Sequence, residues 1–305
     1  MGTLYLHLGL AKTATTALQN QFFPKLKKIN YLHREIKDKN SLSYKIATYC
    51  FSAEEDLTLL YSVKTSLESL LRETDVLISE EWFTMDYSWF YGFKGASWQE
   101  KLFRLGSIVE EFDFKILITT REPVSGLFSL YCELYNVAQY VRNESFISFI
   151  ETSNDALSYD LASLNKVIDK AFNQSPYLLP YEMLHSDNDF LSALLTWLDR
   201  DNYVEFTNLR NENKTERTES NVVVYSRSFI QKIAGRLFQL APSGYRSWLR
   251  QTFIYKSLYR IFLASRKKYQ IPTPELTDIE VIRVKFKSTV EYYKSLEESR
   301  LIGSG

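Results

Sequence analysis

The 305-residue sequence predicts an α/β protein: a doubly wound parallel sheet flanked by helices, followed by a helical C-terminal extension. Up to about residue 182, short apolar runs rich in β-branched and aromatic residues alternate with longer segments of helical period. The runs are mostly apolar and do not alternate with polar residues, which is typical of strands that helices cover on both faces. Strands joined by helices indicate right-handed crossovers and hence a parallel sheet.

Strands are expected at residues 4–8, 75–79, 115–120 and 177–181, with helices between them at about 15–27, 41–71, 97–111, 123–140 and 158–172. Later helices are expected at about 187–199, 221–240, 246–268 and 278–299, with a polar loop at 207–220. Thr277 and Glu280 have capping-box spacing and predict the start of the last helix. We therefore divide the chain into an α/β core (1–219) and a helical extension packed on it (220–302).

The composition, 45% hydrophobic and 24% charged, is that of a folded globular protein and excludes intrinsic disorder. The sequence has no run of about 18 uncharged apolar residues and no secretion-signal pattern, so a cytoplasmic protein is expected. Cys50 and Cys132 are far apart and only three histidines occur, which argues against disulfide and zinc scaffolds. No metal is expected.

The positive charge is concentrated in one segment. Lys and Arg together number 37, as do Asp and Glu, yet residues 220–274 contain ten basic side chains and no acidic one. Such a segment suits an anionic partner, such as a phosphate-bearing cofactor, a polyanion or a membrane surface. Nucleic acid is not expected. The alternative is a solvated basic helical face.

The loop after the first strand has the features of an anion cradle. Ligands of such sheets bind beyond the carboxyl ends of the strands, and the first amides of the following helix are unpaired at the positive end of its dipole. Lys12 adds a charge and the threonines add hydroxyls; the candidate residues are Gly9, Ala11, Lys12, Thr13, Ala14, Thr15 and Thr16. An ordinary turn with a threonine cap is the alternative. The loop is not a Walker A motif, because its glycine lies only three residues before the lysine.

Two further strand ends carry candidate residues. Arg121 ends the third predicted strand, and Ser129 follows about two turns into the next helix. The guanidinium and the hydroxyl are therefore expected to bind one phosphate. The alternative for Arg121 is a buried ion pair. Glu80 and Glu81 end the second strand and are candidate bases for an acceptor hydroxyl. Their alternative is capping or pairing with basic residues. His7, inside an apolar strand, receives a supporting role.

Aromatic residues crowd the stretch after the glutamates, where an irregular loop is expected. Trp82, Trp89 and Tyr91 are candidates for an acceptor-binding wall, because flat amphipathic rings suit sugars, aromatic groups and lipids. The alternative is a hydrophobic cluster beneath a long loop.

Taken together, these segments resemble the sulfotransferase family. Residues 7–19 resemble its 5′-phosphosulfate loop, especially the bacterial pattern H-x-G-x-x-K-T-G-T-T-x-L-Q, except that Ala14 replaces the last glycine. The segment from Arg121 through Pro123 and Ser129 to Tyr131 is similar to the family's 3′-phosphate segment. Residues 79–81 resemble its Ser-x-Glu, and residues 177–184 its fourth-strand segment. The resemblance covers about residues 3–215.

The resemblance implies a P-loop-like fold and 3′-phosphoadenosine 5′-phosphosulfate (PAPS) as the donor, without a metal. It implies that Lys12 neutralises the leaving group, that Arg121 and Ser129 hold the 3′-phosphate with Lys214 and Arg217 as secondary candidates, and that Glu81, or else Glu80, is the base. The expected acceptor is a hydroxyl or amine, with a carbohydrate or glycolipid favoured. Two rivals are a P-loop-like nucleotide-dependent kinase and a non-catalytic protein that binds polyanions or a membrane surface.

Overall fold

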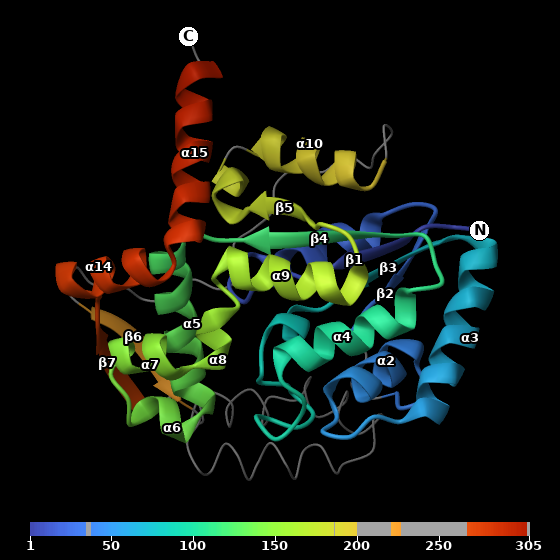
Figure 1. Cartoon of the computed structure of the whole chain (residues 1–305), viewed down its shortest axis with the longest axis horizontal. Helices are drawn as coiled ribbons and strands as arrows, with labels where there is room; N and C mark the ends of the chain where they lie inside the picture. The colour runs from blue at the N-terminus through green and yellow to red at the C-terminus, as the bar shows by residue number, and fades with distance from the viewer. Residues whose placement is uncertain (35–37, 186, 200–220, 227–266, 304–305) are drawn as a thin grey trace, which may run out of the picture.

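The computed structural model describes residues 1–34, 38–185, 187–199, 221–226 and 267–303, and a five-stranded sheet lies at its centre (Figure 1). The strands are β1 (Leu4–His7), β2 (Ile29–Leu32), β3 (Asp75–Ser79), β4 (Phe114–Thr120) and β5 (Tyr177–Pro180), in the order β2-β3-β1-β4-β5. All neighbouring pairs are parallel. The predicted doubly wound α/β fold is confirmed, although β2 was not predicted.

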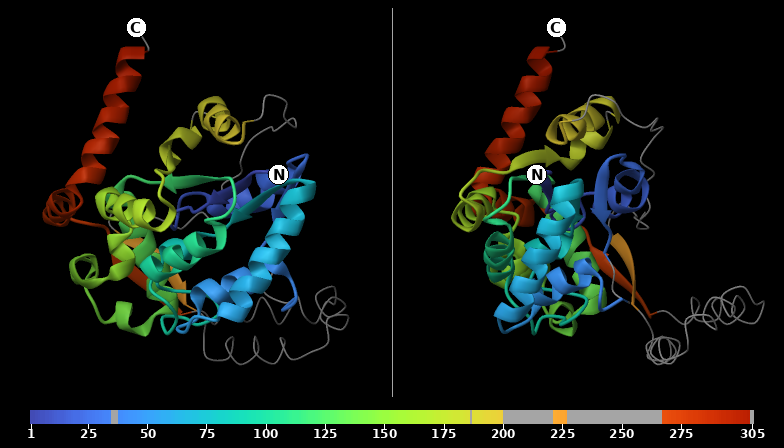
Figure 2. Two further views of the ribbon diagram at one scale, coloured as in Figure 1. Left: turned by 45° about the vertical axis from the view of Figure 1, so that its right-hand side comes forward. Right: turned by 90° about the vertical axis from the view of Figure 1, so that its right-hand side faces the viewer.

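Each face of the sheet has its own apolar core, because alternate residues of a strand point to opposite faces. One face carries Leu4, Leu6, Val76, Ile78, Ile116 and Ile118. It packs against α2 (Leu42–Phe51), α3 (Leu57–Glu73), α4 (Trp98–Val109), α5 (Pro123–Val137) and α9 (Leu161–Phe172). The other face carries Tyr5, Leu77, Leu117 and Leu179, which pack against residues 18–23 and α10 (Asp187–Trp197). Figure 2 shows helices on both sides of the sheet.

The helices of the core differ from the prediction mainly at their breaks. The single helix predicted over 41–71 is wrong: it is two helices, since the Ser52 to Asp56 segment is not helical and the Asp56 side chain caps α3 by accepting from the amide of Leu59. The helix predicted over 123–140 ends at Val137 and is followed by α6 (Gln139–Arg142). The shorter helices α7 (Phe146–Thr152) and α8 (Asn154–Leu157) precede α9.

The C-terminal part corrects several predictions. The helix predicted at 221–240 is wrong at its start, where residues 221–226 form the strand β6 (Asn221–Ser226). The valine run of this segment favours a strand, and β6 pairs antiparallel with β7 (Lys267–Pro272). The helix predicted at 246–268 is therefore also wrong at its last two residues. Most of the basic 220–274 segment lies outside the described residues, and so does the whole of the loop predicted at 207–220.

The last predicted helix, 278–299, is two helices, α14 (Leu276–Lys285) and α15 (Lys287–Gly303). The capping box predicted at Thr277 and Glu280 is wrong: the residues that form it are Glu275 and Asp278, each two positions earlier in the sequence. Buried Phe286 separates the two helices. Figures 1 and 2 show α15 extending away from the body of the molecule. The division at residue 219 stays a prediction.

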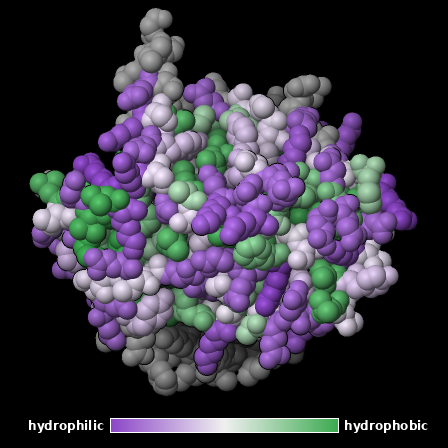
Figure 3. All heavy atoms as spheres, viewed as in Figure 1, coloured by the Kyte–Doolittle hydropathy of each residue, from purple (hydrophilic) through white to green (hydrophobic). Residues whose placement is uncertain are grey.

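The surface seen in Figure 3 is mostly hydrophilic, with its apolar residues in small separate groups. Leu276 (85% exposed) and Val284 (69% exposed) on α14 are among the exposed apolar side chains. Within the described ranges, no helix combines the length and the apolarity that crossing a bilayer requires.

A buried polar network fixes the segment that follows β3. Lys101 of α4 is fully buried, and its ammonium donates to the carbonyl oxygens of Met85 (2.5 Å) and Asp86 (2.9 Å). Asp155 of α8, 2% exposed, accepts a hydrogen bond from the Asp86 amide (2.6 Å). Burial lowers the pKa of Lys101 to about 8. Burial, with repulsion from Asp86, raises the pKa of Asp155 to about 7.

The Asp155 carboxyl gives the protein a specific pH dependence. Its pKa lies near 4 when unfolded and near 7 when folded, so between these values the folded state holds a proton that the unfolded state has lost. Stability should therefore fall as pH rises from 5 to 7. In Asp155→Asn, whose amide oxygen still accepts from Asp86, melting temperatures measured across this range should fall less steeply. Asp169→Asn, at an exposed position of α9, is the control, and equal slopes in wild type and Asp155→Asn would contradict the assignment.

Candidate functional site

The candidate residues meet at the carboxyl ends of three adjacent strands. β1 lies between β3 and β4, all parallel, with His7 opposite Ser79 and Leu117. The loop after β1, the glutamates after β3 and Arg121 after β4 therefore leave the sheet at the same edge. This edge is where ligands of open α/β sheets bind.

The loop after β1 is held by its carbonyl oxygens. Four consecutive carbonyls accept hydrogen bonds from side chains: Gly9 from Thr84 (3.0 Å), Leu10 from Thr13 (2.6 Å), Ala11 from the Tyr159 hydroxyl and Lys12 from Arg121 Nη1 (2.9 Å). Three of the four donors come from elsewhere in the chain. The carbonyl oxygens of residues 9–12 thus already accept hydrogen bonds. The amides at the start of α1 (Thr15–Ala17), in contrast, lack partners within the helix.

The backbone of this loop is unusual. Lys12 and Ala14 both have left-handed conformations, with φ of 66° and 62°. Ala14 is the residue before α1, and no side chain caps that helix, so the alternative of an ordinary threonine cap is not what forms. α1 continues into a π-helical turn, η1 (Leu18–Phe22), and a 3-10 turn, η2 (Phe23–Lys25). Gly9 is required by space: a Cβ there would lie 2.5 Å from Thr119 Oγ1.

Lys12 and the serines of α5 face one another. The Lys12 ammonium lies 3.3 Å from a carboxylate oxygen of Glu133, and both side chains are partly exposed. Ser125, Ser129 and Glu133 recur every four residues on α5 and so share one face of that helix. Ser129 therefore lies on the side of α5 that approaches the loop.

Arg121 joins the two predicted phosphate segments. Besides its bond to Lys12, its Nε donates to Ser125 Oγ (3.3 Å), and its guanidinium lies 4.7 Å from the ring centre of Tyr181. A direct bond between residues 109 positions apart links the motifs that sequence reasoning read separately. The alternative of a buried ion pair is not observed, because the contacts described for Arg121 are to a carbonyl, a hydroxyl and a ring.

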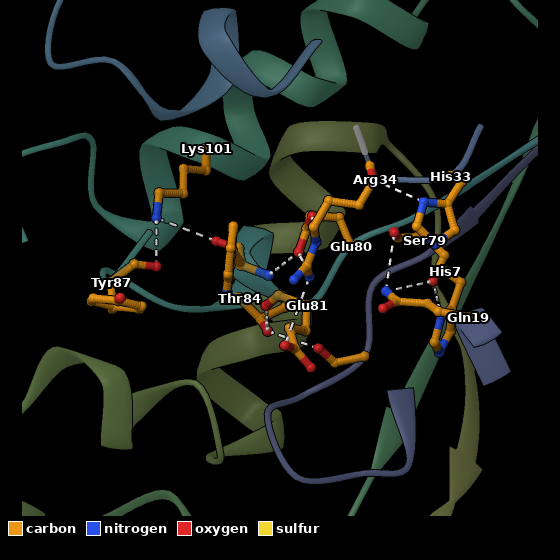
Figure 4. A network of polar contacts seen from close by, with 12 residues as sticks. His7, Gln19, His33, Arg34, Ser79, Glu80, Glu81, Thr84, Tyr87 and Lys101 are labelled. Atoms are coloured by element: carbon orange, nitrogen blue, oxygen red, sulfur yellow. Dashed lines mark hydrogen bonds and ion pairs between the residues drawn. The ribbon is translucent and has the colours of Figure 1, made fainter. Parts of the chain in front are cut away.

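The two glutamates differ in their surroundings (Figure 4). Glu80 is buried, receives a bidentate hydrogen bond from Arg34 and accepts from the Trp82 amide (3.1 Å). Glu80 therefore makes the pairing and capping contacts that were expected of a glutamate without a catalytic role. Glu81, 19% exposed at its side chain, lies 3.7 Å from Arg34 Nη2 and shares a hydrogen bond with Thr15 of the loop.

Burial raises the pKa of Glu81 above its ordinary value, and repulsion from Glu133 and Glu80 adds to the rise. Attraction by Arg34 and the Thr15 hydrogen bond oppose it. A carboxylate with a raised pKa, beside the loop and only partly exposed, is suited to accept a proton.

Arg34 was missed by sequence reasoning. It follows β2, a strand of four residues interrupted by Asn30, so its place at the same edge of the sheet could not be inferred. Its guanidinium contacts both glutamates and lies 3.9 Å from the centre of the Trp82 ring. The signal available was a basic residue two positions after a short apolar run.

His7 is a buried residue at the centre of the sheet. Its Nδ1 lies 2.7 Å from Ser79 Oγ and its Nε2 lies 3.2 Å from Thr119 Oγ1. Burial lowers its pKa to about 3, so the ring is neutral at physiological pH. Gln19 donates to the same Ser79 hydroxyl (3.2 Å), and the set ties β1, β3 and β4 together beneath the loop.

The aromatic stretch forms the expected irregular loop, with a bridge between Ser88 and Gly92. Trp82 stacks on Arg34 beside the glutamates, whereas Trp89 and Tyr91 lie at the bridge, where Trp89 is 39% exposed. Lys214 and Arg217 lie outside the described residues. In the part of the chain that the structure describes, no group of three or more His, Cys, Asp or Glu is arranged to hold a metal ion.

The chain was compared with known proteins. No family model and no curated protein matches the sequence. Among solved structures, a sulfotransferase from Alicyclobacillus acidocaldarius is similar, with 15% identity and a TM-score of 0.39 over 67% of this chain and 85% of that chain.

The left-handed Ala14 makes a prediction about stability. Gly adopts this conformation without the Cβ clash that costs other residues about 1–2 kcal/mol. Ala14→Gly should therefore raise the free energy of unfolding, measured in urea, by about 1 kcal/mol. Ala17→Gly, three residues along at φ −67°, should lower it by about 1 kcal/mol. A loss of stability in both variants would refute the strain at Ala14.

Proposed function

We propose that this protein transfers a sulfuryl group from PAPS to a hydroxyl or amine acceptor. The observation that carries the proposal is the joining of three motif segments at one edge of the sheet. Arg121 donates to the carbonyl of Lys12, and the Thr84 hydroxyl contacts the carbonyl oxygens of both Gly9 and Glu81, so segments near residues 12, 81 and 121 form one cluster. Each has the residue type that the sulfotransferase resemblance assigns to it.

The positive groups fit a nucleotide that carries two separate phosphates. The amides at the start of α1, with Lys12 and the threonine hydroxyls, would bind the 5′-phosphosulfate. Arg121 and Ser129 would bind the 3′-phosphate, with Lys214 and Arg217 as proposed additions. The Lys12 ammonium pairs with Glu133. Partly exposed ion pairs of this kind contribute only about 0–1 kcal/mol, so a phosphate can replace the carboxylate.

The proposed chemistry is an in-line displacement at sulfur. Glu81 accepts the proton of the acceptor, whose oxygen or nitrogen bonds to sulfur while the bond from sulfur to the 5′-phosphate oxygen breaks. The products are the sulfated acceptor, 3′-phosphoadenosine 5′-phosphate and a proton. Lys12 neutralises the charge that develops on the departing phosphate oxygen. Positioning and electrostatic stabilisation supply most of the acceleration, as in phosphoryl transfer.

The donor is tested first, by thermal-shift titration with 3′-phosphoadenosine 5′-phosphate beside ADP and ATP, with and without Mg²⁺. A ligand present at about 100 times its dissociation constant stabilises the fold by about 2.7 kcal/mol. We expect stabilisation by the 3′-phosphorylated nucleotide, independent of Mg²⁺ and lost in Lys12→Ala. Stronger stabilisation by Mg²⁺-ATP would favour a kinase. No shift with any nucleotide would leave the polyanion- or membrane-binding alternative.

Substitution of Glu81 and substitution of Glu80 should affect different properties of the protein. Glu81→Gln removes the proposed base and should lower the transfer rate about 10²–10⁴-fold with little change in melting temperature. Glu80→Gln leaves Arg34 with one weaker partner in a buried pair, so its main effect should be a lower melting temperature. Full transfer activity in Glu81→Gln would overturn its role as the base.

A further inference from the structure

A pocket opens beside the glutamates, between α2 and the carboxyl ends of β2 and β3. Its volume is about 380 Å³, including its open mouth. Six apolar side chains line it: Leu32, Ile46, Ala47, Ile78, Phe83 and Phe90. The polar lining is Arg34, Ser43, Ser79 and Glu80, and Figure 4 shows that two of these, Arg34 and Glu80, lie beside Glu81.

Aromatic contacts hold the apolar walls in place. The Phe83 ring packs edge-on against Phe51, with centroids 5.1 Å apart, and Phe90 packs edge-on against Tyr44, also at 5.1 Å. Phe83 is 1% exposed and its fixed ring forms part of the core. A pocket with such walls is formed before a ligand arrives and gains affinity from burying an apolar surface.

The polar end of the pocket leads to Glu81. Arg34 lines the pocket and lies 3.7 Å from the Glu81 carboxylate, which in turn contacts Thr15 of the anion-binding loop. Glu81 itself does not line the pocket, but a molecule that seats its apolar part among the phenylalanines has its polar group beside Arg34, which contacts Glu81.

The charges at this end disfavour an anion. Arg34 contributes one positive charge, and both its carboxylate partners, Glu80 and Glu81, are within ion-pair distance. With both carboxylates ionised, the three groups carry a net charge of −1. The guanidinium already pairs with both of them, so an incoming carboxylate would meet repulsion from Glu80 and Glu81.

We propose that this pocket binds the acceptor by an aromatic or cyclic aliphatic ring, in a molecule that is neutral or cationic and that presents its hydroxyl or amine to Glu81. The role of acceptor rests on the proposed function, whereas the binding of the ring does not. The pocket thus selects a ring-bearing alcohol or amine over a bare sugar, which differs from the carbohydrate that the sequence favoured.

The test uses three probes that share one ring and differ in charge: 2-phenylethanol, 2-phenylethylamine and phenylacetate, with glucose as the sugar. Binding to the full chain is measured by ligand-detected NMR titration. We expect the alcohol and the amine to bind at least about tenfold more tightly than phenylacetate or glucose. Ala47→Leu and Ser43→Leu fill the pocket from α2 and should each weaken the alcohol at least about tenfold. Ala162→Leu, at an exposed position of α9, should leave binding unchanged.

The outcomes separate the pocket from the reaction. Equal binding of 2-phenylethanol to wild type and both filled variants, or a preference for phenylacetate, would overturn the inference. Transfer to glucose that is unchanged in Ala47→Leu would also overturn it, while the proposed function stood. Pocket-dependent binding of the alcohol without any stabilisation by 3′-phosphoadenosine 5′-phosphate would support the pocket and defeat the proposed donor.

Discussion

The loop after β1 depends on hydrogen bonds that its own residues cannot supply. Its carbonyl oxygens are taken by Thr84, Tyr159 and Arg121, which come from three distant parts of the chain. A backbone with two left-handed non-glycine residues is costly, and it persists only where its surroundings fix it. The same bonds bring Arg121 and the segment after Glu81 to the loop. The same hydrogen bonds therefore fix the conformation of the loop and assemble the candidate site.

Arg34 decides which glutamate is available for chemistry. Removing two charges from water is expensive, and a buried pair is tolerated only when its hydrogen bonds are satisfied. The bidentate contact with Glu80 meets that condition and uses its carboxylate oxygens. Glu81 receives only the more distant contact of the same guanidinium and keeps its bond to Thr15. Neighbouring residues of one type thus acquire different roles from one cation, whose position depends on β2.

The sequence predicts the strands whose apolar residues stand in unbroken runs and misses those whose pattern a loop or a helix also produces. β1, β3, β4 and β5 each contain such a run, so both the sheet and the candidate site at its edge followed from them. β2 is four residues long at the edge of the sheet and includes Asn30, a pattern that a loop also produces. Without β2, neither Arg34 nor the apolar pocket beside it could be inferred. β6 was missed because a valine run before further apolar residues fits a helix as well as a strand.

The C-terminal helix α15 is hydrogen-bonded to residues that hold the candidate site in place. Thr289 donates to the Tyr159 carbonyl (2.8 Å) and accepts from the Leu161 amide (2.9 Å), and the hydroxyl of Tyr159 in turn holds Ala11 of the loop. Tyr293 donates to Thr120, the last residue of β4 and the neighbour of Arg121. These contacts span more than 120 positions, so local patterns in the sequence could not reveal them. One set of these hydrogen bonds leads from Thr289 through Tyr159 to the loop, and the other joins Tyr293 to the residue before Arg121. The helix α15 therefore helps to position the site.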